Sequence, residues 1–509
     1  MTAAADLILT NGAVHTLTDP DETADGVAIR DGRIVRVDRA YELDFLTGTE
    51  TEVVDLDGRV VLPGFIDAHT HLNMVGRRLV HADLAEADGP ADCIDLLSES
   101  ARDAGWILGY GYDESEWDES RYLTREDLDE VSTDRPVAAF REDLHVASLN
   151  SVALDQFLSA MPDEDVLAED GEPTGVVVES ALDVIFEATE PDAAEMHDLL
   201  TAAQHHANAL GVTGVHDMVR NSTAPGVFRD LELADELTLR VRLNYWTDHL
   251  DAAIETGLRT NHGSDLVRTG AIKSYTDGSF GGRTAKLSES YADGDSTGQW
   301  VVEPEELGTN VKLANRAGFQ FCAHAIGDDA ISAVLNAYEE LTEDPGGARH
   351  RVEHAELLSD EHIDRFADLG VVASVQPNFL RWAHEGGLYD SRLGEERRRQ
   401  TNRYADLLEA GVPLAFGSDC MPLNPLFGVH QAVNAPDPAQ RLSVTEALRA
   451  YTIGSAYAGF DEDRLGTVEN GKWADLVVLD ESPWEFPEAI EDIDVTMTIV
   501  DGEVVYDDR

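Results

Sequence analysis

Short apolar, β-branched runs alternate with longer helical patterns between Pro63 and about Ala458, and this alternation constrains the fold more than any other feature. Strands separated by helices predict parallel βα units, and eight such units predict a closed barrel. Seven runs lie at residues 211–217, 239–245, 270–275, 318–324, 350–354, 371–376 and 413–419, and an eighth precedes His69. We therefore expect an α/β protein built on a TIM-type (β/α)8 barrel.

Both ends of the chain have a different sequence pattern, in which short apolar runs are separated by turn residues. Asn11-Gly12, Asp31-Gly32 and Asp501-Gly502 each lie beside such runs and predict hairpins. Neither end alone makes a complete sheet. We therefore expect residues 1–60 and 460–509 to pair into one small composite β-sandwich domain.

The first two barrel strands are much further apart than a βα unit requires. The barrel would comprise residues 61–75 and 196–459, which leaves residues 76–195 as an insertion over the barrel mouth and the active site. This insertion holds the richest aromatic cluster of the chain, formed by Trp106, Tyr110, Tyr112 and Trp117.

The composition excludes several classes of partner. The chain has 100 acidic and 37 basic residues, a net charge of −63, and this field repels nucleic acid and anionic membranes. The acidity is spread along the chain and only four lysines occur, which indicates a halophilic protein from a high-salt cytoplasm. No signal peptide or membrane-spanning stretch is evident, so we expect a cytoplasmic protein; a homodimer is left open.

Polar residues capable of metal chemistry follow the predicted barrel strands, at the ends where barrel enzymes place their active sites. His69 and His71 are two residues apart, so on a strand both imidazoles face the same side and suit zinc or a similar cation. Each histidine could also be an ordinary packed side chain, and Asp419 could cap a helix. The full set is His69, His71, Lys273, His324, His354 and Asp419.

With these motifs the chain resembles the amidohydrolase superfamily, and within it the amidohydrolase-3 branch that includes N-substituted formamide deformylases. The resemblance covers nearly the whole length. It rests on Leu-Pro-Gly-Phe-Ile-Asp-Ala-His-Thr-His (62–71), His145 with Asn150-Ser151, Glu172-Pro-Thr-Gly-Val176, Lys273 ahead of Asp277-Gly-Ser, His324-Ala-Ile-Gly-Asp328, His350-Arg-Val-Glu-His354 and Gly417-Ser-Asp419. The chain departs from the branch at Asp143-Leu144-His145 and at Gly281-Gly282-Arg283, neither of which contains an implied metal ligand.

The resemblance implies a centre for one or two divalent ions, with zinc as the expected metal. His69 and His71 would hold one ion, His324 and His354 a second, and Asp419 would coordinate from the eighth strand. Lys273 would bridge the ions as a carbamate, although a protonated lysine that binds a substrate carboxylate or an oxyanion is the alternative. A metal-activated water would be the nucleophile, and Asp419 would act as general base and then as general acid.

The function that follows is hydrolysis of a C–N bond other than a peptide bond, in an amide or N-formyl amide of small size. His145, Arg283 and Trp117 are the candidate substrate contacts. One alternative is a cyclic-amide or ester-type hydrolase on the same barrel. A second is a non-catalytic binding protein, which the intact set of histidines, lysine and aspartate argues against.

Overall fold

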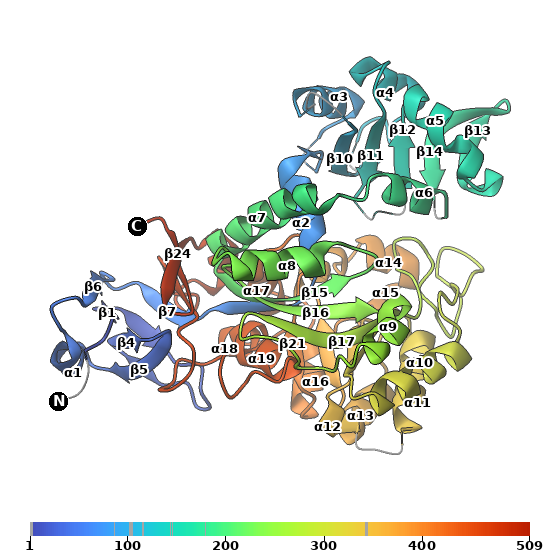
Figure 1. Cartoon of the computed structure of the whole chain (residues 1–509). Coiled ribbons are helices and arrows are strands. Elements are labelled where there is room, and N and C mark those ends of the chain that lie inside the picture. The colour runs from blue at the N-terminus through green and yellow to red at the C-terminus, as the bar shows by residue number, and fades with distance from the viewer. Residues whose placement is uncertain are drawn as a thin grey trace. The chain divides into compact units, whose positions relative to one another are not determined.

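The computed structural model describes residues 4–85, 87–100, 105–114, 117–142, 144, 146–178, 180–341 and 345–509. Within these residues the chain divides into two compact units (Figure 1). One unit contains residues up to His71 together with 204–221 and 228–509. The other contains residues 72–203 and 222–227. Each unit has sheets and apolar cores of its own.

The first unit contains the predicted barrel. In the described part of the chain, eight strands pair in parallel, each with the next along the chain, which confirms the predicted parallel barrel. Their residues are buried almost throughout, as expected for a parallel sheet covered on both faces. The strands are β8 (Phe65–Thr70), β15 (Val212–Val219), β16 (Arg240–Trp246), β17 (Val267–Tyr275), β18 (Phe321–Ala325), β19 (Arg351–His354), β20 (Val372–Val375) and β21 (Leu414–Phe416).

Helices lie between these strands along the chain. α13 shows why the sequence starts and stops a helix where it does: Ser359 caps its first turn in a capping box, and Gly370 ends it in the left-handed conformation. The helices of this region are α8 (Ala224–Leu233), α9 (Leu250–Glu255), α10 (Pro304–Arg316), α11 (Asp328–Glu339), α12 (Pro345–Ala348), α13 (Asp360–Leu369), α14 (Leu388–Leu393), α15 (Glu395–Arg398), α16 (Tyr404–Glu409), α17 (Pro425–Val433), α18 (Val444–Arg449) and α19 (Ser455–Ala458).

The barrel closes between β21 and β8 without a regular ladder among the described residues. Instead, the backbone N–H of Ser418 donates to the carboxylate of Asp67 at 3.1 Å, and that of Asp419 donates to the carbonyl of His69 at 2.7 Å. A Cβ at Gly417 would lie 2.4 Å from the backbone nitrogen of His69, so only glycine allows this approach. Closure therefore sets His69 beside Asp419.

Strands from both ends of the chain pair with each other in the same unit. In the described residues, a six-stranded sheet has the order β24-β23-β22-β7-β2-β3, and a four-stranded sheet has the order β5-β4-β1-β6. One apolar cluster includes residues of both sheets. The strands are β1 (Leu7–Thr10), β2 (Ala13–His15), β3 (Thr23–Ala24), β4 (Gly26–Arg30), β5 (Arg33–Asp38), β6 (Glu52–Asp55), β7 (Val60–Pro63), β22 (Leu476–Leu479), β23 (Val495–Val500) and β24 (Glu503–Asp507), with the helix α1 (Ala40–Leu43).

The predicted hairpin turns have different outcomes. Asp31-Gly32 joins the antiparallel pair β4 and β5, and Asp501-Gly502 joins β23 and β24; all four residues have positive φ, as tight hairpins require. Asn11-Gly12 is not a hairpin turn. It carries the chain from β1 in one sheet to β2 in the other, so that prediction was wrong.

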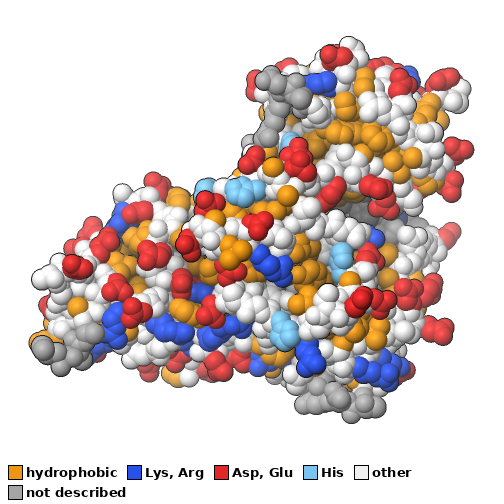
Figure 2. Space-filling model, viewed as in Figure 1, with side chains coloured by type: hydrophobic (Ala, Val, Ile, Leu, Met, Phe, Trp, Pro, Cys, Tyr) orange, Lys and Arg blue, Asp and Glu red, His pale blue; other side chains and the backbone are white. Residues whose placement is uncertain are grey.

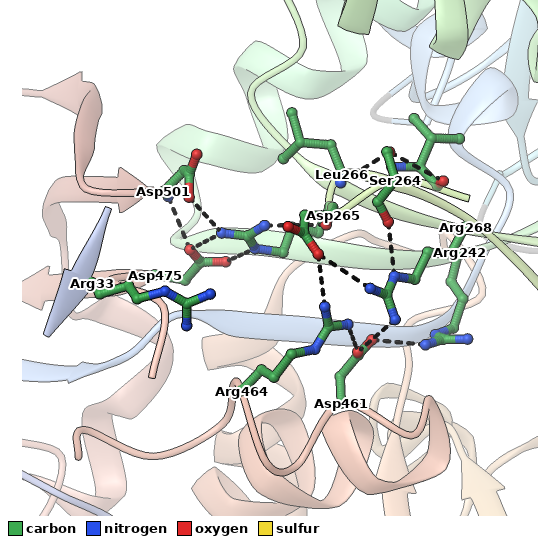
Figure 3. A network of polar contacts seen from close by, with 12 residues as sticks. Arg33, Arg242, Ser264, Asp265, Leu266, Arg268, Asp461, Arg464, Asp475 and Asp501 are labelled. Carbon is green, nitrogen blue, oxygen red and sulfur yellow. Dashed lines mark hydrogen bonds and ion pairs between the residues drawn. The ribbon is translucent and has the colours of Figure 1, made fainter. Parts of the chain in front are cut away.

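An ion-pair network lies at the amino end of the barrel strands, where the barrel meets the terminal sheets (Figure 3). Arg240, at the start of β16, binds both carboxylate oxygens of Asp475 at 2.6 and 2.9 Å. Asp461 lies between Arg242, Arg268 and Arg464. We call this set the basal network; its members are Arg240, Arg242, Arg268, Arg464, Asp265, Asp461, Asp475 and Asp501.

The second unit is built on a sheet with the order β13-β14-β12-β11-β10-β9. It packs through two apolar clusters, one of which contains Tyr112 and Trp117. Its elements are α2 (Leu72–Val80), β9 (Ala82–Asp83), α3 (Pro90–Glu99), β10 (Ile107–Tyr112), α4 (Arg125–Val131), β11 (Val137–Arg141), β12 (Val146–Leu149), α5 (Ser151–Phe157), β13 (Val166–Glu169), β14 (Glu172–Val178) and α6 (Ser180–Ala188). The helix α7 (Ala193–Ala209) leads from it into the barrel unit.

The visible surface carries more acidic than basic side chains. Figure 2 shows Asp and Glu scattered over the visible face, with far fewer Lys and Arg. This distribution matches the net charge of −63 and the absence of an acidic tail in the sequence. Among the helices of the described residues, none is long and apolar enough to cross a membrane.

Candidate metal centre

The candidate site lies at the carboxyl ends of the barrel strands, which face one mouth in any parallel barrel. Each predicted ligand comes from an apolar strand that stops at this edge. They are His69 in β8, His71 just after it, Lys273 in β17, His324 in β18, His354 at the end of β19 and Asp419 just after β21.

His69, His71 and Asp419 form the tightest group. Among the described residues, each offers a ligand atom, and these atoms all lie within 4.8 Å of one another. The Oδ1 atom of Asp419 is 3.3 Å from Nε2 of His71 and 3.6 Å from Nε2 of His69. The barrel seam creates this group, because it places the first and last strands side by side.

Lys273 is buried next to this group. Its side chain is 1% exposed, and its Nζ atom lies 3.3 Å from Nε2 of His69. The amine also lies over the ring of Trp246, 5.7 Å from the centroid. Burial lowers the pKa of Lys273 even though the charge of Glu353 acts to raise it. Burial thus makes this amine easier to deprotonate than that of an exposed lysine.

His324 and His354 complete the ring of imidazoles. Their ring centroids are 4.4 Å apart, and that of His354 is 5.0 Å from that of His69. Nε2 of His324 is 3.1 Å from the carbonyl of Gly278 and must donate to it, which leaves Nδ1 with the lone pair. Nδ1 of His354 is buried and, among the described residues, has no hydrogen-bond partner. Both histidines therefore have a nitrogen free to bind a metal.

The protonation states at the site favour metal binding. Burial holds the pKa values of His69, His324 and His354 well below the ordinary value, so their imidazoles are neutral. Burial acts to raise the pKa of Asp419, but the neighbouring nitrogen groups, including the hydrogen bond from His71, stabilise the carboxylate and lower the pKa. Neutral imidazoles and an ionised carboxylate are the forms that bind cations.

Glu353 and Arg351 support the site and were missed by the sequence analysis. Both are fully buried, and Oε2 of Glu353 lies 2.7 Å from Nδ1 of His69. Two charged residues at alternate positions of the short strand β19 point to the same side of the sheet. That spacing, directly before His354, is the signal that could have found them.

Asp277 anchors the loop that follows β17. Its buried carboxylate accepts backbone N–H groups from Lys286 at 2.8 Å, Ile326 at 3.0 Å and Gly327 at 2.9 Å. It also lies 3.5 Å from Nε2 of His324. The loops after β17 and β18 are held together beside the predicted ligands by this one side chain.

Two of the predicted substrate contacts have other partners in the described structure. Arg283 is 43% exposed in its side chain and pairs with Asp293 at 2.8 Å. Trp117 is 5% exposed within the core of the second unit, where its indole N–H donates to the carbonyl of Ala87. That contact gives Trp117 a packing role. His145 lies outside the described residues.

The residues present suit a divalent metal ion. Imidazole nitrogens and a carboxylate oxygen converge, the imidazoles are neutral, and a buried ring nitrogen of His354 has no partner among the described residues. Nitrogen-rich sites of this kind are typical of zinc and of other borderline cations.

Comparisons with known proteins agree with this geometry. A model of the amidohydrolase family matches residues 52–506. The chain is 32% identical to Protein LONG AFTER FAR-RED 3 of Arabidopsis thaliana, covering 99% of this chain and 92% of that one. It is 28% identical to the N-substituted formamide deformylase of Arthrobacter pascens, covering 100% and 99%.

A solved structure extends the comparison to three dimensions. An uncharacterized metal-dependent hydrolase from Pyrococcus furiosus has a TM-score of 0.81 and 31% identity, covering 94% of this chain and 99% of that one. The family match spans the barrel strands and every predicted metal ligand. The chain therefore belongs to the amidohydrolase family of metal-dependent hydrolases.

Proposed function

We propose that the protein hydrolyses a C–N bond other than a peptide bond in a small molecule, with an N-formyl amide or another amide as substrate. The observation that carries the proposal is the convergence of His69, His71 and Asp419 beside the buried amine of Lys273. The similarity to an N-substituted formamide deformylase supports the choice of bond.

His69, His71 and Asp419 would hold a divalent ion, and His324 and His354 offer further imidazole nitrogens, with the His354 ring centroid 5.0 Å from that of His69. Zinc suits this set of ligands best. A bound ion of this kind supplies a Lewis acid that polarises a carbonyl and lowers the pKa of water. Whether one or two ions bind decides the role of the second histidine pair.

Asp419 is the residue that we assign to proton transfer. Its side chain is 19% exposed, whereas that of His69 is 1% exposed, so its carboxylate is the more accessible to substrate. A carboxylate oxygen can take the proton of the attacking water and return it to the nitrogen of the leaving amine. The carboxylate ends the cycle in its starting form.

Lys273 is proposed to carry a carbamate. The neutral Nζ amine would attack carbon dioxide and form an N–C bond, releasing one proton and leaving an anionic carboxylate on the lysine. Burial of Lys273 and its 3.3 Å distance from Nε2 of His69 support this choice, because a buried ammonium beside a metal would be repelled. A protonated lysine that binds a substrate carboxylate or an oxyanion is the alternative.

The remaining assignments stay predictions. They are substrate contact by His145, Arg283 and Trp117, a cover of residues 76–195 over the barrel mouth, a composite terminal sandwich domain, a homodimer, and a cytoplasmic location in a high-salt cell. Arg283 would have to leave Asp293 to reach a substrate.

A substrate panel tests the proposed function. Metal-replete protein is assayed with N-formyl amines, N-acyl amino acids and cyclic amides, and its bound metal is measured. Turnover of N-formyl amines or simple amides that stops on chelation and returns with zinc is the expected result. Turnover of cyclic amides alone would replace the proposal with the cyclic-amide alternative. Full turnover without metal would refute it.

A further inference from the structure

Arg351 occupies the interior of the barrel, and its guanidinium contacts acceptors from several strands. It is 0% exposed. Nε donates to Oε1 of Glu353 at 2.8 Å, and one terminal nitrogen donates to Oε2 at 3.0 Å. That same nitrogen reaches the carbonyl of Ala68 in β8 and Oγ of Ser374 in β20. The other terminal nitrogen lies 2.9 Å from Nδ1 of His216 in β15.

The chemistry of this guanidinium fixes the protonation of its neighbours. An arginine side chain only donates hydrogen bonds, so Glu353 meets it as a carboxylate and Nδ1 of His216 meets it as a lone pair. A carboxylate only accepts. Because Oε2 of Glu353 lies 2.7 Å from Nδ1 of His69, that nitrogen must carry the proton. The lone pair of His69 is then on Nε2.

Nε2 is the nitrogen that faces the candidate metal centre. It lies 3.3 Å from Nζ of Lys273 and 3.6 Å from Oδ1 of Asp419. We propose that Glu353, held by Arg351, is a positioning residue that fixes the tautomer and the orientation of His69 so that Nε2 is presented to the metal. The proposal rests on the metal-dependent function proposed above, and it adds residues that no motif of the sequence assigned.

The competing explanation is that Glu353 only neutralises a buried arginine. The basal network contains a pair of that purely structural kind. Asp475 accepts two hydrogen bonds from Arg240, at 2.6 and 2.9 Å, and both side chains are at least nine-tenths buried. In the described residues, no hydrogen bond or ion pair of the Asp475 carboxylate involves a histidine. Asp475→Asn is therefore a matched control for Glu353→Gln.

The glutamine variant keeps the size of the side chain, removes its negative charge and changes its hydrogen bonding; Asp475→Asn removes the charge of its own ion pair in the same way. Both carboxylate oxygens of Glu353 accept from donors. In either orientation the new amide NH₂ group faces a donor. At the position of Oε1 it meets Nε of Arg351, and at the position of Oε2 it meets a terminal nitrogen of Arg351 and Nδ1 of His69. Glu353→Gln therefore breaks the chain of donors and acceptors that sets the tautomer.

The experiment measures zinc affinity by competition with a chelator, without substrate, and the visible spectrum after cobalt substitution. We expect Glu353→Gln to lose about 10–100-fold in zinc affinity and to change the cobalt spectrum, as loss of an outer partner of a metal-binding histidine does. Asp475→Asn is expected to keep both values while losing stability. Equal affinities in the two variants would overturn the proposal.

A second measurement uses the unaltered protein and does not depend on the folding of any variant. The metal-free chain is labelled with ¹⁵N-histidine, and the signal of His69 is assigned by its loss in His69→Gln. The expected state is a proton on Nδ1 and none on Nε2. A proton on Nε2 would overturn the proposal. Both measurements omit substrate, so failure of the proposed hydrolysis would leave their outcome unchanged.

Discussion

The two ends of the barrel bury polar groups in opposite ways. At the amino end every guanidinium of the basal network meets a carboxylate, as Arg240 meets Asp475 and Arg242 meets Asp461 (Figure 3). At the carboxyl end, in the described residues, Lys273 has no carboxylate within ion-pair distance and Nδ1 of His354 has no partner at all. Among the described residues, the fold therefore pairs every guanidinium of the basal network with a carboxylate at one end, and leaves the Lys273 amine and one ring nitrogen of His354 without such a partner at the other.

Whether a buried polar group has a partner distinguishes the groups that stabilise the fold from those that are available for chemistry. A buried polar group without a partner costs free energy, so chains retain such groups where another molecule will bind. A buried ion pair with both partners present loses much stability only when one partner is removed. Variants at the two ends should consequently fail in different assays.

The largest effect is expected at the carboxyl end. Asp419→Ala should lower turnover by about 10²–10⁴-fold, because it removes the group that transfers protons, while the fold is kept. His69→Ala should abolish turnover, with loss of bound metal as the cause. Steady-state rates and metal content per chain measure both. Normal turnover in either variant would contradict the assignment.

Removing a charge at the amino end should act on stability instead. Asp475→Asn leaves the guanidinium of Arg240 buried without its partner and should lower the free energy of unfolding by about 3–5 kcal/mol. Denaturant unfolding measures the change, and turnover per folded molecule should match that of the unaltered protein. If Asp475→Asn lost turnover but kept its stability, the amino end of the barrel would not have the purely structural role that we assign to it.

Lys273→Ala tests whether the unpaired amine belongs to the metal centre. If the side chain carries a carbamate, the variant should lose metal and activity, and a short-chain carboxylic acid should restore part of both. Activity with and without added acetate or propionate, together with metal analysis, gives the answer. Full metal content with weaker substrate binding alone would favour the protonated lysine.

Dissolved salt should change the free energy of unfolding least per charged side chain. It acts on exposed charges, each of which contributes less than about 1 kcal/mol. The net charge of −63 should nevertheless make thermal stability rise between dilute buffer and molar potassium chloride, where the Debye length falls to about 3 Å. Asp475→Asn should show the same dependence. A melting temperature that does not change with salt concentration would contradict halophilic adaptation.

The sequence predicts the barrel and the placement of the candidate ligands because both are local patterns. Each candidate ligand follows an apolar run, and the end of a run can be read without knowing its neighbours in space, as for His324 after Phe321. Partnerships across the fold cannot be read this way. The bond between Glu353 and His69 joins residues 284 positions apart, so the local pattern of β19 can mark Glu353 but cannot give its partner.

Two other differences have the same physical origin. Asn11-Gly12 has the composition of a hairpin turn, and Asn11 has the positive φ of one, but the flanking strands pair in different sheets. Composition indicates a bend and not the partner. Trp117 is a candidate substrate contact in the sequence analysis, and in the structure it stacks on Tyr112 in the core of the second unit.

The barrel seam also bears on the order of folding. Its contact between Ser418 and Asp67 spans 351 positions of the chain, so it closes a very long loop. Contacts of such high order form late, because the loss of chain entropy precedes the gain in contacts. His69 and Asp419 flank this seam, and an open barrel has no assembled site. Recovery of activity during refolding is therefore expected to lag behind the recovery of helical signal, and it reports the moment at which the barrel closes.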